Sequence, residues 1–72
     1  MEDEMANDTQ VRYFRFINNE MSQAELAERT GVSRQTIGAI EGGDYSPSVW
    51  LALRIAGVLG TTVEELFIPG EE

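Results

Sequence analysis

Residues 22–41, which run SQAELAERTGVSRQTIGAIE, decide the fold of this chain. Ser22, with Glu25 three residues later, forms the Ser-x-x-Glu capping box that starts a helix. Gly31 ends that helix after about two turns, because glycine adopts the left-handed conformation of a sharp reversal without steric cost. The stretch therefore predicts a short helix followed by a tight turn.

The turn leads into a second helix, which we expect to run from an N-cap at Ser33 to about Glu41. Val32 precedes the cap and is placed to pack on Ile37 as a hydrophobic staple. Two helices that cross after so short a turn need a small side chain where their backbones approach, and Ala27 supplies it.

One face of this second helix is predicted to be buried. Ile37 and Ile40 are three residues apart, which is the spacing that packs a helix against a core, here against Leu26 and the first helix. The opposite face is left free for solvent or a ligand, and it consists of Arg34, Gln35, Gly38 and Ala39.

Helices are also expected on both sides of this pair. The first begins at a candidate N-cap, Thr9, and ends at Asn18-Asn19, with core positions at Val11, Phe14 and Ile17. Residues 42–47 are typical of a loop. Ser48 then caps a helix that Gly60 ends, with a core face of Val49, Ala52, Ile55, Ala56 and Leu59.

A short fifth helix completes the predicted fold. Thr62 and Glu65 form its capping box, and it carries Val63, Leu66 and Phe67 before Pro69-Gly70. No strand pattern is present, so we expect an all-α domain over residues 9–68, with acidic tails at 1–8 and 69–72.

The composition excludes most catalytic chemistry. The 72 residues suffice for one domain, and they include no cysteine and no histidine. Disulfides, thiolate nucleophiles, common zinc sites and imidazole acid–base catalysis are thereby excluded, so we expect neither an enzyme nor a bound cofactor or metal. The sequence has no membrane-spanning run and no signal peptide, which predicts a cytoplasmic protein.

The net charge of −8 is concentrated at the two ends. Residues 1–10 and 60–72 each carry four acidic side chains and no cation, whereas the middle of the chain is neutral. All five cations are arginines. Either a salt-rich cytoplasm or a coding bias toward arginine accounts for this composition.

Three pieces of the sequence together resemble the lambda-repressor-like helix-turn-helix family, the Cro and XRE-type regulators of phages and prokaryotes. They are Ser22-Gln23-Ala24-Glu25-Leu26-Ala27, Gly31-Val32-Ser33-Arg34-Gln35-Thr36-Ile37 and Ile40-Glu41. The likeness covers about residues 11–68 and is greatest to minimal single-domain members, whose Tyr-x-Pro-Ser step is matched by Tyr45-Ser46-Pro47-Ser48. It implies a compact five-helix fold with the helix-turn-helix at helices two and three.

The resemblance also implies that the chain binds double-stranded DNA, with the helix after Ser33 in the major groove. Arginine forms bidentate hydrogen bonds with guanine, glutamine forms them with adenine, and a side-chain methyl group packs on the thymine methyl. Base contacts are accordingly expected from Arg34, Gln35, Thr36 and Ala39. Phosphate contacts are expected from helix N-termini and the following loop, at Ser22, Gln23, Ser33, Gly42, Gly43 and Tyr45.

Some positions depart from the family pattern. Gly38, where a side chain is usual, either permits close approach to DNA or reflects tolerance at an exposed site. Gly42 and Asp44 stand where Asn and Lys are common, which removes a phosphate contact and adds a repulsive charge. Arg15 is either the partner of Glu41 or an exposed arginine.

The first hypothesis is therefore a sequence-specific transcriptional regulator, a repressor bound as a homodimer to a palindromic site. A dimer interface is expected at Trp50, Val63 and Phe67, since tryptophan is enriched at interfaces. The alternative is a protein-interaction module or antitoxin-like subunit with weak or no DNA binding. Rising salt concentration weakens DNA binding steeply but weakens an apolar protein interface much less. The salt dependence of binding therefore separates the regulator from the interaction module. No small-molecule ligand is evident.

Overall fold

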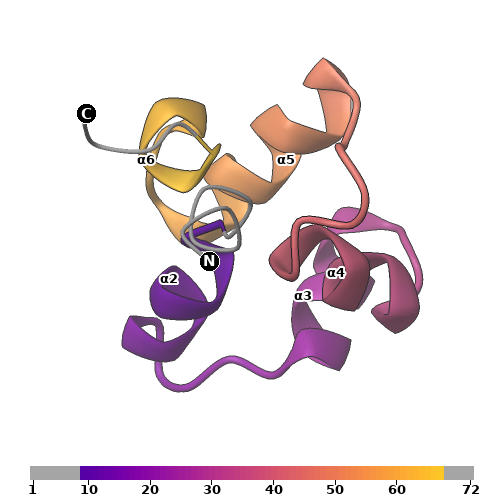
Figure 1. Cartoon of the computed structure of the whole chain (residues 1–72). Coiled ribbons are helices and arrows are strands. Elements are labelled where there is room, and N and C mark those ends of the chain that lie inside the picture. Colours follow the sequence, from indigo (N-terminus) through magenta and orange to yellow (C-terminus); the bar gives the residue numbers. More distant parts are fainter. Residues whose placement is uncertain (1–8, 68–72) are drawn as a thin grey trace, which may run out of the picture.

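The computed structural model describes residues 9–67, which form five α-helices and no strand (Figure 1). In chain order the helices are α2 (Val11–Ile17), α3 (Gln23–Thr30), α4 (Arg34–Glu41), α5 (Val49–Leu59) and α6 (Val63–Phe67). The predicted all-α, five-helix fold is confirmed. The predicted tails at 1–8 and 69–72, and the last residue of the predicted domain, lie outside the described residues.

Four helices begin where a hydroxyl side chain accepts a hydrogen bond from the backbone N–H three residues later. The four acceptors are the predicted caps, and the distances are 2.9 Å for Ser22, 3.0 Å for Ser33, 3.1 Å for Ser48 and 3.1 Å for Thr62. Each cap satisfies one of the N–H groups that a helix start leaves without an intrahelical partner.

The carboxylate half of each predicted capping box forms a different contact. Glu25 pairs with Arg29, one turn along the helix, at 2.9 Å, and Glu65 accepts from the Thr61 hydroxyl. The predicted cap at Thr9 is wrong, because α2 starts after Gln10, whose side chain forms no cap bond. Thr9 instead accepts weakly from the Val11 N–H at 3.3 Å.

The helices enclose a single apolar core. In Figure 1, α3 and α4 lie together at the lower right, α2 and α6 lie at the left, and α5 lies across the top. α3 packs on both α4 and α5, and α2 packs on α4 and α6. The buried apolar side chains are Val11, Met21, Leu26, Ala27, Ile37, Ile40, Ala52, Ile55, Ala56, Leu59 and Leu66.

Two residues that we predicted to face the core are exposed, Ile17 by 54% and Val49 by 77%. At 3.6 residues per turn, two three-residue steps from Val11 place Ile17 about 120° away from it around the helix. Val49 is the first residue of α5 and lies about 70° from the centre of its buried face. Both sit at the edge of a face that tertiary packing covers only in part.

Among residues 9–67, no helix combines the length and the apolar character that crossing a bilayer requires.

Candidate nucleic-acid interface

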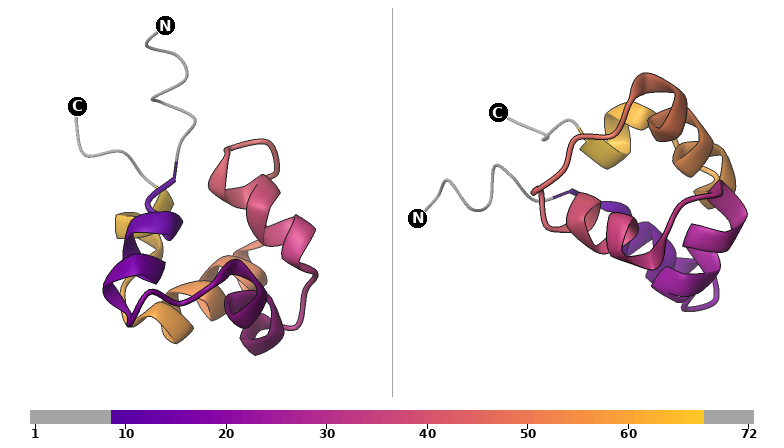
Figure 2. Two further views of the ribbon diagram at one scale, coloured as in Figure 1. Left: turned by 90° about the horizontal axis from the view of Figure 1, so that it is seen from below. Right: turned by 90° about the vertical axis from the view of Figure 1, so that its right-hand side faces the viewer.

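The predicted two-helix unit forms as α3, a tight turn and α4, and Figure 2 shows it from two further sides. Gly31 ends α3 with φ +80° and donates its N–H to Ala27 O at 2.8 Å. Beyond the turn, Ile37 and Ile40 are fully buried and anchor α4 to the core. The opposite face of α4 is therefore directed away from the protein.

Arg34 and Gln35 lie exposed at the start of α4. Neither side chain forms a hydrogen bond within the part of the chain that the structure describes. Thr36 is half-buried, and its hydroxyl lies 2.9 Å from the Ser33 hydroxyl, so its hydrogen-bonding capacity is partly used. Ala39 is half-buried one turn further along. Base contact by these four residues stays a prediction.

The residues predicted to contact phosphate fall into two groups. Ser22 and Ser33 are exposed and use their hydroxyl oxygens to cap α3 and α4. Gly42, Gly43 and Tyr45 lie exposed in the loop between α4 and α5. The arrangement places two helix N-termini and one loop around the free face of α4, and phosphate contact by these residues also stays a prediction.

Gln23 is half-buried and is bonded to Glu41, and its phosphate contact also stays a prediction. Its Nε2 donates to Glu41 Oε1 at 3.0 Å. Glu41 also accepts from Arg15, at 2.6 Å from Nε and 3.1 Å from Nη2. Arg15 is therefore the partner of Glu41 and not an exposed arginine. Residue types alone did not reveal that Gln23 joins the pair.

The Arg15–Glu41–Gln23 network connects three helices. Arg15 comes from α2, Gln23 begins α3 and Glu41 ends α4. A further donation from Arg15 Nη1 to Met21 O, at 2.7 Å, fixes the segment just before α3. The network thus holds the N-terminus of α3 beside the C-terminus of α4.

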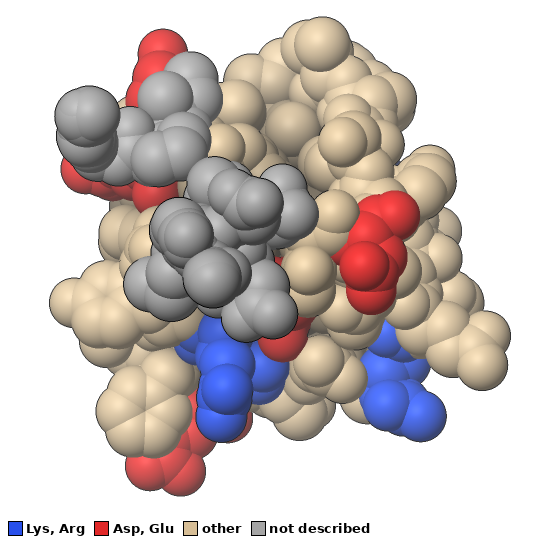
Figure 3. All heavy atoms as spheres, in the orientation of Figure 1, with Lys and Arg blue, Asp and Glu red and all other residues tan. Residues whose placement is uncertain are grey.

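The surface charge is mixed. In Figure 3, basic side chains lie in separate groups with acidic ones between them, and no continuous basic patch covers the face shown. The residues described also contain no cluster of side chains suited to hold a metal ion. Counterion release on DNA binding scales with the cations that reach the backbone, and the chain has five arginines that could supply them.

The helix-turn-helix geometry agrees with known families. The Helix-turn-helix family model matches residues 14–66. This chain belongs to the XRE-type helix-turn-helix family. The fold is also similar to the crystal structure of a hypothetical transcription factor, NHTF, from Neisseria. It superposes with a TM-score of 0.71 at 30% identity, over 83% of this chain and 68% of that one.

Other helix-turn-helix proteins are closer in sequence. An uncharacterized HTH-type transcriptional regulator of Methanothermobacter thermautotrophicus is 57% identical over 53 residues, covering 72% of this chain and 77% of the relative. One of Methanocaldococcus jannaschii is 48% identical over 58 residues, covering 81% and 86%. YgzD of Bacillus subtilis, which has the same description, is 49% identical over 51 residues, covering 71% and 77%.

Gly38 lies where the helix-turn-helix core meets the free face of α4. A Cβ at this position would lie 3.8 Å from Gln23 Nε2, which is ordinary contact. We expect Gly38→Ala to raise the free energy of unfolding by about 0.5–1 kcal/mol, because glycine inside a helix costs that much. Urea denaturation measures the change in the free energy of unfolding, and a variant less stable than wild type would contradict the prediction. The DNA affinity of the same variant separates close approach from simple tolerance.

Proposed function

We propose that this helix-turn-helix protein is a sequence-specific DNA-binding regulator that reads the major groove with α4. In this proposal Arg34 and Gln35 contact base edges, and the starts of α3 and α4 and the loop at Gly42–Tyr45 contact phosphates. The protein acts in the cytoplasm as a homodimer on a palindromic site, and it represses by occluding a promoter.

The observation that carries the proposal is the free pair at the start of α4. Arg34 and Gln35 are exposed, adjacent and without partners among the described residues, on a helix that two buried isoleucines hold rigidly. A rigid helix limits the conformational entropy that base contacts would cost. Bidentate contacts of arginine to guanine and of glutamine to adenine each contribute about 1–3 kcal/mol of discrimination.

The mixed charge of the surface supports the homodimer. One copy offers few cations to the DNA backbone, so a single half-site would be held weakly. Two copies joined about a two-fold axis would double the contacts and would require half-sites about one helical turn apart.

Selection from a random duplex DNA library tests the proposal. We expect wild-type protein to enrich a palindromic motif at moderate salt, and Arg34→Ala/Gln35→Ala to lose it or change it, with affinity for the selected site falling by about tenfold or more. Arg29→Ala is the matched control, because it also removes one exposed arginine, from the far end of α3. It should enrich the wild-type motif.

Two outcomes would overturn the proposal. One is the absence of any enriched motif from folded wild-type protein at every salt concentration. The other is a motif that the double variant retains in full, which would place recognition elsewhere than on α4. Enrichment of a motif without two-fold symmetry would remove only the palindromic site.

A further inference from the structure

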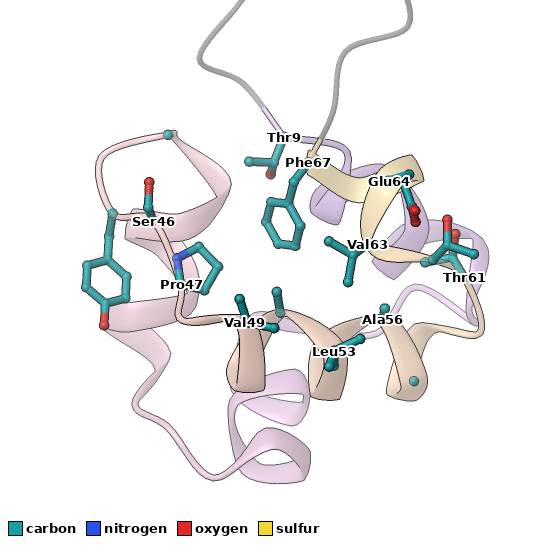
Figure 4. Close-up of a pocket in the computed structure, with 15 residues that line it drawn as sticks. Thr9, Ser46, Pro47, Val49, Leu53, Ala56, Thr61, Val63, Glu64 and Phe67 are labelled. Atoms are coloured by element: carbon teal, nitrogen blue, oxygen red, sulfur yellow. The ribbon is translucent and has the colours of Figure 1, made fainter.

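The outward side of α5 is an apolar surface that nothing in the described chain covers. Val49 is 77% exposed, Trp50 71% and Leu53 54%, and Gly57 lies exposed two turns after Val49. We call these four residues the α5 outer face. Val49, Leu53 and Gly57 also line an open groove of about 920 Å³ between α5 and α6, which has Val63 and Phe67 on its other side (Figure 4).

Nothing within one copy of the chain requires glycine at position 57. It sits inside α5, and a Cβ there would meet no atom within 4 Å. Its backbone is not in the left-handed region that favours glycine, since only Gly31, Gly43 and Gly60 have positive φ among the described glycines. A glycine in a helix interior costs about 0.5–1 kcal/mol relative to alanine. Glycine at such a position suits the close approach of a second backbone or side chain.

The spacing of the α5 outer face is complementary to itself. Val49, Leu53 and Gly57 follow at intervals of four residues and therefore form one stripe along the helix. In an antiparallel pair of α5 helices about a two-fold axis through Leu53, residues equally distant from Leu53 meet. Leu53 then packs on its copy, and each Val49 packs on the Gly57 of the other chain.

We propose that a second copy of this chain docks on the α5 outer face, through the stripe Val49, Leu53 and Gly57 with Trp50 beside it. This inference rests on the homodimer of the proposed function and names its interface. The interface predicted from the sequence contained Trp50 together with Val63 and Phe67. The two α6 residues are half-buried against the core, so they form the rim of the groove and not the centre of the contact.

The absence of acidic side chains from α5 lowers the charge repulsion between two copies that meet at this helix. The chain carries a net charge of −8, so two copies repel each other unless the contact excludes acidic groups. α5 contains no acidic residue, and its one charged residue, Arg54, stacks on Trp50 with 5.6 Å from the guanidinium to the ring centroid. Figure 3 shows the surface over α5, at the upper right, without visible charged side chains.

The available area indicates a weak dimer. Trp50 and Tyr45 are 71% and 50% exposed. Since an aromatic side chain buries about 150–250 Å² when covered, these two offer roughly 250 Å² to a partner. Stable interfaces bury roughly 800 Å² per partner. These two side chains supply less than half of that area, so dimerisation should depend on concentration and increase on DNA.

Sedimentation velocity over a series of protein concentrations, without DNA, tests the interface. We expect wild-type protein to shift from monomer to dimer, and Leu53→Glu to raise the dimer dissociation constant at least about tenfold, because like charges would meet on the two-fold axis. Ile17→Glu is the matched control: the residue is also 54% exposed and the charge change is the same. It should dimerise as wild type does.

Trp50 supplies a second readout, since it is the chain's single tryptophan. Its fluorescence should shift to the blue as wild-type protein is concentrated and should not shift for Leu53→Glu. Gly57→Ala should stabilise the dilute monomer, as we also expect of Gly38→Ala, yet weaken the dimer. A substitution that affects folding alone is not expected to stabilise the monomer and at the same time weaken the dimer.

The results separate this inference from the proposed function. Wild-type protein that stays monomeric at all concentrations and on its selected DNA overturns the interface, whereas an enriched DNA motif would still stand. Equal weakening by Leu53→Glu and Ile17→Glu, with both variants folded by circular dichroism, also overturns it. A dimer that Leu53→Glu disrupts but that enriches no DNA would keep the interface and remove the DNA-binding proposal.

Discussion

Ile37→Ala should lower the free energy of unfolding by about 3 kcal/mol, within the 2–5 kcal/mol measured for such truncations in protein cores. Ile37 is fully buried in α4 and packs in the core cluster with Leu26 and Ile40. The truncation removes apolar area from the core and leaves a cavity that the neighbouring helices fill only in part. A domain of this size has a total stability of about 4–11 kcal/mol. Much of the variant population should therefore unfold on mild heating.

Urea denaturation followed by far-ultraviolet circular dichroism measures the loss, and Ile17→Ala is its control. Ile17 has the same side chain on a helix of similar length but is 54% exposed. Its truncation should change stability by less than about 1 kcal/mol. Equal losses from the two variants would show that Ile37 is not the core anchor of α4.

Glu41→Ala should lower the free energy of unfolding by about 3 kcal/mol, because breaking a largely buried ion pair leaves the remaining charge without compensation. The side chains of Arg15 and Glu41 are 15% and 9% exposed. Glu41 accepts three hydrogen bonds from Arg15 and Gln23. Removing it leaves the Arg15 guanidinium in a site from which water is mostly excluded.

The control for this prediction is Glu25→Ala, which breaks the other ion pair among the described residues. Arg29 and Glu25 are 54% and 45% exposed, so this loss should be about 0.3–0.5 kcal/mol. Thermal and urea denaturation of the two variants give the comparison. An Arg15→Met/Glu41→Leu double variant should be more stable than Glu41→Ala, because it leaves no uncompensated charge. Similar losses for Glu41→Ala and Glu25→Ala would mean that the network contributes little.

The starts of α3, α4, α5 and α6 could be predicted because each depends on a short stretch of chain. Ser22, Ser33, Ser48 and Thr62 each accept from an N–H only three residues away. The residue type and its spacing therefore specify the cap without knowledge of the rest of the fold. The carboxylates of the capping boxes were less predictable, since Arg29 competes for Glu25 within the same helix.

The candidate site could be predicted in its position and only partly in its geometry. The free face of α4 follows from the spacing of Ile37 and Ile40, which are buried as expected. The engagement of Gln23 by Glu41 did not follow, because a glutamine at a helix start is equally suited to solvent or to a phosphate. Its partner within the protein depends on where the end of α4 lies.

The sequence by itself determined where four of the five described helices begin, where helices end and which residues anchor α4, because these depend on hydrogen bonds and periodicity within a few residues. Only the tertiary structure decided which edge residues are covered and which long-range polar contacts form. The Arg15–Glu41 contact joins residues 26 positions apart, and the Gln23–Glu41 contact joins residues 18 positions apart. Val49, at the edge of the buried face of α5, remains exposed to solvent. Such contacts exist only once the packing of five helices has fixed their relative positions.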